Sequence, residues 1–300
     1  MKEYSISLSQ IRKKAIEAFV EVTELLNKYK IEYWLDYGTL LGAIRDKTII
    51  PWDGEFDISA MDSNIDLNSK IWKELEDLGY VLNFGEFNIK IRKKSQLIGS
   101  FVIDLHRYKE TVNGALYEYG RKPKSKFENL IFYIHRVIST ALPIENVPNI
   151  TFTRIYNEIM NKTGAKISEI DCAEVIIKIG ETNKCPFVLF FKEKKIEFDV
   201  LARRKFLTKA LYYFFSALPL SLNKLLINKL EKNLNKIEFI PLKRVYIKNY
   251  YKNLTTTEFC GLNFPCFKES QLYLKDVYGA NWSIPTNKWE LIHDSPLSKK

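Results

Sequence analysis

Apolar side chains recur every three to four residues near the start of the chain. The pattern is carried by Ile11, Ala15, Phe19, Val22 and Leu26. This spacing predicts an amphipathic helix over residues 8–29. Ser7 and Gln10 are spaced as in a capping box, so we expect the helix to begin beside Ser7.

Shorter apolar runs follow. The segment IEYWLD, residues 31–36, predicts a short buried strand, and Gly38 permits a tight turn into a helical segment from Thr39 to Arg45. A strand is then expected around residues 55–60.

The next pattern is again helical and is followed by strands. Leucine and isoleucine spacing predicts a helix over residues 67–78 that ends at Gly79 in a left-handed cap. Three strand candidates come next, namely YVLNF, FNIKIRKK and IGSFVIDLHRY. Helices interleaved with such strands predict an α/β (α+β) core with a mixed β-sheet flanked by helices.

The second half of the chain changes in character. Long segments rich in aromatic residues and lysine predict helices at residues 126–142, 151–162 and 200–234. A further helix is expected from Glu269 to Tyr278, ended by Gly279. We therefore predict a catalytic core over residues 1–110 and a mainly helical region over residues 111–300 packed on that core, with a closing segment at residues 258–285.

Three acidic residues, Asp53, Glu55 and Asp57, alternate along the chain just after Pro-Trp. In an extended segment they point the same way, and their mutual repulsion must be offset by a cation. Asp104 is a fourth acid inside an apolar strand, which we expect to lie next to the strand of Glu55 and Asp57. The alternative is an acidic turn followed by an unrelated edge-strand aspartate.

Carboxylate oxygens are the ligands that hard divalent cations prefer. If the acids converge, Glu55, Asp57 and Asp104 are the candidate metal ligands and catalytic residues, with Mg²⁺ or Mn²⁺ as the cofactor. His106 lies on the same strand face as Asp104, so it is a candidate proton relay or a structural hydrogen-bonding group.

Composition narrows the class of protein. The net charge of +10 suits an anionic partner, but much of the excess is lysine among asparagine and isoleucine, so we expect no nucleic-acid surface. The four cysteines form no CxxC pair, which argues against a zinc finger.

The first residues lack the features of a secretory signal, so a cytoplasmic location is expected. Residues 210–223 are uncharged but too short to span a membrane.

The stretch YWLDYGTLLGAIRDKTIIPWDGEFDIS resembles the signature of the LicD family, which includes phosphocholine transferases and fukutin-related phospho-alcohol transferases and has a nucleotidyltransferase-like fold. The shared residues are Gly38, Thr39, Leu40, Leu41, Gly42, Arg45, Ile50, Pro51, Trp52, Asp53 and Asp57. The segments GLNFPCF and YLKDVYGANW also resemble that family's closing motif, whereas residues 110–240 match nothing assignable.

The resemblance implies a transferase that moves a phospho-alcohol group, most simply phosphocholine from CDP-choline, onto a sugar hydroxyl and releases CMP. The acceptor would be a cell-surface glycan, a lipopolysaccharide precursor or a lipid-linked glycan. Residues expected to contact the nucleotide or substrate are Gly38, Thr39, Arg45, Asp36, Asp53, Tyr278 and Trp282. Asp36 is expected to face the cleft, and Asp104 to complete the metal site or accept the proton.

One departure from the family pattern is visible. Gly54 replaces an acid, and Glu55 stands where the family has the first aspartate of an Asp-x-Asp pair. A nucleotidyltransferase that transfers NMP to a sugar or protein, and a non-catalytic nucleotide-binding partner in glycan assembly, therefore remain as alternatives. The aromatic, basic segments around residues 126–141 and 203–232 either pack on the core or attach peripherally to the inner face of a membrane.

Overall fold

The computed structural model describes residues 2–94, 98–141, 150–179, 187–197, 206–234, 237 and 239–285. The strands of its largest sheet are β2 (Trp34–Leu35), β3 (Glu55–Met61), β4 (Tyr80–Phe84), β5 (Asn88–Lys93), β7 (Val102–Thr111), β8 (Gly114–Pro123) and β13 (Phe239–Ile247). Their order is β13-β8-β7-β3-β2, with β5 beside β7 and β4 beside β5. β3 and β7 run parallel and the other pairs are antiparallel, so the expected mixed sheet is confirmed.

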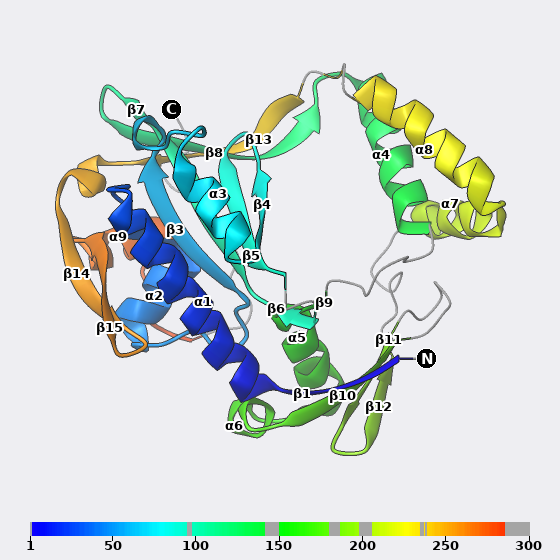
Figure 1. The fold of residues 1–300 in the computed structure, drawn as a ribbon, viewed down its shortest axis with the longest axis horizontal. Helices are drawn as coiled ribbons and strands as arrows, with labels where there is room; N and C mark the ends of the chain where they lie inside the picture. Colours follow the sequence, from blue (N-terminus) through cyan, green and yellow to red (C-terminus); the bar gives the residue numbers. More distant parts are fainter. Residues whose placement is uncertain are drawn as a thin grey trace.

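Helices cover this sheet. They are α1 (Leu8–Lys28), α2 (Tyr37–Arg45), α3 (Lys70–Asp77) and α9 (Ser270–Tyr278). The Gln10 N–H donates to Ser7 Oγ at the start of α1, as its sequence predicts. Phe19 of α1 stacks on Phe56 of β3, with ring centroids 4.5 Å apart. Because neighbouring side chains of a strand point to opposite faces, α1 leaves the face with Glu55 and Asp57 free for other contacts (Figure 1).

The C-terminal segment completes the N-terminal core. A hairpin of β14 (Leu254–Phe259) and β15 (Leu262–Phe267) packs beside α2 and β2. Ring centroids lie 5.2 Å apart between Phe264 and Phe19, and 5.5 Å apart between Phe267 and Trp34. Gly279 ends α9 with φ 86°, in agreement with the sequence-based expectation.

A second, antiparallel sheet lies below the first (Figure 1). It contains β1 (Lys2–Ser7), β10 (Glu174–Ile179), β11 (Phe187–Phe191) and β12 (Lys194–Glu197), in that order. Between the two sheets lie α5 (Phe152–Thr163) and the strand pair β6 (Ile98–Ser100) and β9 (Ile150–Thr151), and α6 (Ile167–Asp171) lies beside the second sheet (Figure 1). Two 3₁₀ turns are also present, η1 (Asp62–Asn64) and η2 (Asn249–Lys252).

Three helices form a separate layer beyond the ends of β8 and β13 (Figure 1). They are α4 (Lys126–Ala141), α7 (Phe206–Ala217) and α8 (Leu220–Leu234). Their shared buried cluster consists of Val137, Ile138, Tyr212, Phe215 and Ile227. Among the described helices, none combines the length and the hydropathy needed to cross a membrane.

The expectation of a largely helical C-terminal part is wrong. Helices are present over most of the predicted ranges, with the last range divided into α7 and α8, while residues 142 and 200–205 lie outside the described part of the chain. The same region also supplies β8 to β15. Most of these strands are short, and two pair with segments distant in sequence: β10 with β1, and β13 with β8. Local periodicity does not reveal such partners. The division at residue 110 remains a prediction, although the largest sheet contains strands from both sides of it.

Candidate active site

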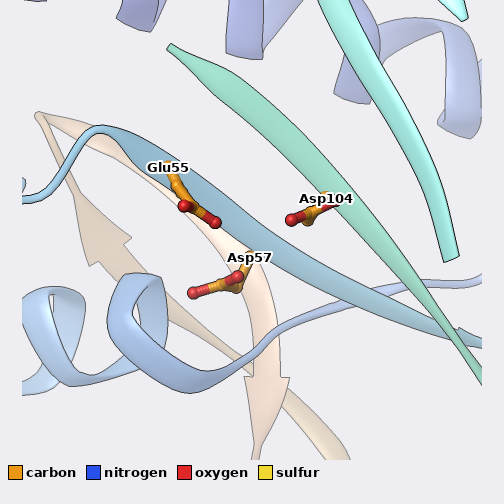
Figure 2. A group of neighbouring side chains, drawn as sticks. All are labelled: Glu55, Asp57 and Asp104. Atoms are coloured by element: carbon orange, nitrogen blue, oxygen red, sulfur yellow. The ribbon is translucent and has the colours of Figure 1, made fainter. Parts of the chain in front are cut away.

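The three predicted metal ligands meet on two neighbouring strands. The parallel register of β3 and β7 places Asp57 opposite Asp104, and Glu55 precedes Asp57 by two residues on the same face. One carboxylate oxygen from each residue lies within 4.8 Å of those of the other two. Figure 2 shows the three side chains directed toward one another across the two strands. The predicted convergence of these acids is confirmed.

The surroundings of this acidic cluster fit a hard cation. Its three carboxylates supply the oxygen ligands that Mg²⁺ and Mn²⁺ favour. Desolvation and repulsion from Asp57 and Asp104 raise the pKa of Glu55 to about 7. Desolvation and repulsion from Asp57 and Glu55 raise the pKa of Asp53 to about 8. Excess negative charge is thus concentrated here, and a divalent cation would relieve it.

Two residues of β5 hold Asp104. Lys90 Nζ lies 2.8 Å from Asp104 Oδ2, and Asn88 Nδ2 donates to Asp104 Oδ1 over 3.1 Å. Neither residue is among the candidates that the sequence pattern indicates. A usable signal existed, because pairing FNIKIRKK against the strand of Asp104 places Asn88 and Lys90 on the same face as that acid.

The start of α2 positions Asp57. The Gly38 N–H donates to Asp57 Oδ2 over 3.2 Å, and the Asp57 N–H donates to Thr39 Oγ1 over 2.7 Å. The positive end of the helix dipole therefore faces this carboxylate. A contact of Gly38 and Thr39 with the nucleotide or substrate remains a prediction; in the structure these groups contact Asp57.

The tight turn before α2 differs from the expectation in one detail. Tyr37 adopts the left-handed conformation, with φ 37°. Gly38 is needed for space, because a Cβ there would lie 2.6 Å from Asp53 Oδ2. Asp53 is thereby brought next to Asp57, although it lies before the strand begins.

Asp36 does not face the cleft. Its side chain is fully buried and accepts hydrogen bonds from Ser59 Oγ and the hydroxyls of Tyr108 and Tyr273. It also caps α2 through the Tyr37 N–H, over 2.8 Å. The structure therefore places Asp36 as a hub beneath the site that joins α2, β3, β7 and α9.

His106 links the cluster to the core. Its Nε2 lies 3.1 Å from Asp57 Oδ1, and its Nδ1 lies 2.8 Å from the hydroxyl of Tyr117, a partner that the sequence did not identify. Burial disfavours the imidazolium, but the hydrogen bond and charge of Asp57, with the charge of Asp104, outweigh it and raise the pKa of His106. The ring is therefore built into the site as an orienting group for Asp57.

The remaining residues predicted to contact the nucleotide or substrate are Tyr278, Arg45 and Trp282. Burial and the nearby charges of Asp57, Asp36 and Asp53 raise the pKa of Tyr278, which places this residue beside the acids. Arg45 forms an ion pair with Asp46 at 2.6 Å, and its buried Nη1 has no hydrogen-bond partner. Trp282 packs on the hydrophobic core.

Gly54 has a structural reason in this protein. A Cβ at this position would lie 2.4 Å from Thr153 Oγ1 and 2.9 Å from the Thr153 backbone nitrogen. The amino end of α5 is thus docked against the loop between Asp53 and Glu55. An acid at position 54 does not fit under this helix.

Substituting Gly54→Asp should therefore destabilise the protein. We expect the free energy of unfolding to fall by about 1–3 kcal/mol, because the new side chain overpacks against the amino end of α5. Urea unfolding measures this loss. The control is Asn64→Asp, which adds the same charge at an exposed position. Equal stability of the two variants would contradict the docking of α5 on Gly54.

Comparison with known proteins connects this geometry to a family. Residues 30–138 match LicD/FKTN/FKRP, nucleotidyltransferase domain. An uncharacterized protein of Rickettsia prowazekii (strain Madrid E) is 38% identical over 87 residues, which is 28% of this chain and 31% of that protein. An uncharacterized protein of Rickettsia typhi (strain ATCC VR-144 / Wilmington) is 33% identical over 124 residues, which is 39% of this chain and 37% of that protein. The chain thus spans about a third of the length of these relatives.

The match contains the whole acidic cluster, Lys90 and the α2 segment, whereas α5 and α9 lie outside it. Residues 30–138 of this chain are a LicD/FKTN/FKRP nucleotidyltransferase domain.

Proposed function

We propose that the protein is a Mg²⁺- or Mn²⁺-dependent transferase that moves a phospho-alcohol group from a CDP-activated donor to a sugar hydroxyl. The observation that carries this proposal is the convergence of Glu55, Asp57 and Asp104 within a domain of this transferase family. Phosphocholine from CDP-choline is the first donor to test. The acceptor we propose is a surface-glycan or lipopolysaccharide precursor.

In the proposed reaction, the metal and the protein side chains have separate roles. The acceptor oxygen forms a bond to the phosphorus that carries the alcohol, the bond from that phosphorus to CMP breaks, and the hydroxyl proton passes to a carboxylate. Glu55, Asp57 and Asp104 would hold the cation, which would neutralise charge on the phosphates. The hydrogen bonds of Gly38 and His106 fix the direction of Asp57, so its oxygens are positioned before the donor arrives.

We propose that two protein cations, Lys90 and Arg45, contact the donor phosphates. Lys90 pairs with Asp104, yet its side chain remains 41% exposed, so its ammonium can turn toward a bound anion. Arg45 offers a buried Nη1 donor without a partner, close to Tyr278. We propose that Lys90 leaves Asp104 when a divalent cation binds and then contacts a donor phosphate.

Substituting Lys90→Met separates the effect of Lys90 on Asp104 from its proposed contact with a donor phosphate. A competing cation is removed from Asp104, so we expect Mn²⁺ to bind several-fold more tightly, while the donor binds about tenfold more weakly. Titration calorimetry measures both affinities. Lys93→Met is the matched control, because Lys93 lies on the same strand and pairs with Glu21. Weaker Mn²⁺ binding by Lys90→Met would contradict this role.

Product analysis tests the proposed function. The purified protein is incubated with CDP-choline, CDP-ribitol or CDP-glycerol, a glycan acceptor and Mg²⁺ or Mn²⁺, and released nucleotide is measured. We expect CMP that depends on both metal and acceptor. Pyrophosphate release from a nucleoside triphosphate would instead identify an NMP transferase. Metal-independent binding of a CDP-alcohol without turnover would identify a non-catalytic partner.

A further inference from the structure

The outer side of α7 carries an apolar stripe that the fold does not cover. Ala210, Tyr213, Phe214 and Ala217 are all exposed, and their spacing of three, four and seven residues places them on one helix face. Tyr213 is 52% and Phe214 58% exposed. Lys209 is the single charged residue of this helix.

The outer side of α8 extends this stripe and adds positive charge. Leu222 and Leu225 are exposed, the latter by 64%, and Lys229 and Lys232 follow them on the same face at seven and ten residues from Leu222. Asn223 and Ile227 point the other way and are buried.

These two stripes lie on consecutive helices. Only Leu218 and Pro219 separate the helices, and the Asn223 side chain ties the turn to α7 by donating to the Phe215 carbonyl over 2.7 Å. Both stripes face away from the buried cluster shared with α4. We call the eight residues Ala210, Tyr213, Phe214, Ala217, Leu222, Leu225, Lys229 and Lys232 the outer surface of α7 and α8.

We propose that this outer surface docks on an anionic lipid bilayer. Exposed aromatic and leucine side chains beside lysines are the chemistry of a helix that lies in the interface of a membrane, and α7 is too short to span one. A twofold contact with a second copy is disfavoured, because it would bring Lys229 and Lys232 against an equally basic surface. The layer formed by α4, α7 and α8 lies beyond the ends of β8 and β13, so it can reach a membrane while the acidic cluster stays in water (Figure 1).

Vesicle sedimentation with the full chain tests the proposal. Vesicles of phosphatidylcholine alone and vesicles containing phosphatidylglycerol are compared at low and high salt. We expect binding to the anionic vesicles that weakens with salt. Tyr213→Ser/Phe214→Ser should lower the partition coefficient by at least about tenfold, and Lys229→Glu/Lys232→Glu should lower it and remove its salt dependence.

Two controls make the result specific. Leu262→Ser/Leu272→Ser removes apolar side chains of similar exposure, 46% and 45%, from β15 and α9, and should bind vesicles as wild type does. Asp57→Asn should also bind normally, so failure of the proposed chemistry and failure of docking are distinguishable. Absence of vesicle binding, binding unchanged in both double variants, or a dimer that Tyr213→Ser/Phe214→Ser dissociates would overturn the proposal.

Discussion

Replacing Asp57 with alanine should abolish turnover, by at least about a thousandfold, while the protein stays folded. Asp57 lies at the centre of the acidic cluster, held by the Gly38 N–H and beside His106. Its removal leaves the cation with two carboxylates and leaves the donor phosphates without a fixed counter-charge. The fold is retained because the loss of two hydrogen bonds is offset by relief of repulsion from Glu55 and Asp53.

CMP release under saturating metal measures this effect. Asp57→Asn is the sharper variant, since it removes the charge and keeps an oxygen that can accept from the Gly38 N–H. Asp66→Asn is the matched control, because it makes the same change at an exposed position after β3. Wild-type turnover in Asp57→Asn would remove Asp57 from the mechanism.

The second large effect is on stability. Replacing Asp36 with alanine should lower the free energy of unfolding by about 3–5 kcal/mol. The substitution leaves the buried hydroxyls of Ser59, Tyr108 and Tyr273 without their shared acceptor and removes the cap of α2. The substitution also removes the hydrogen bond that joins Tyr273 of α9 to the start of α2.

Urea unfolding at constant pH measures this loss, and the slope of the transition reports whether the unfolding stays two-state. Tyr273→Phe removes only one donor from the same hub and should cost about 1 kcal/mol. If Asp36→Ala unfolds at the urea concentration of wild type, Asp36 is not the hub that the structure indicates.

Local pattern was sufficient for the centre of the site. Phe56 and Ile58 alternate with Glu55 and Asp57, so the buried and acidic faces of β3 follow from a period of two. Asp104 is an acid in the middle of an apolar strand, and this position predicts that its strand lies next to the strand of Glu55 and Asp57. The parallel register of β3 and β7 confirms this step.

The sequence pattern does not reveal contacts between residues that lie far apart along the chain. Asp36 accepts from Tyr273, 237 residues later, and Gly54 lies under the amino end of α5. Neither contact has a local signature, so Asp36 was assigned to the cleft and Gly54 was recorded only as a departure from the family pattern. Among the strands after residue 111, β10 and β13 pair with segments far away along the chain, whereas β14 and β15 form a local hairpin that the apolar pattern also does not reveal.

The most direct test of the account is the position of a metal. Crystals of the protein grown with Mn²⁺ and a CDP-alcohol are measured at a wavelength where manganese scatters anomalously. We predict a peak at about 2.1 Å from oxygens of Glu55, Asp57 and Asp104, with Lys90 turned away from Asp104. A fully occupied Mn²⁺ elsewhere, or a bound donor with no peak between β3 and β7, would contradict the central claim.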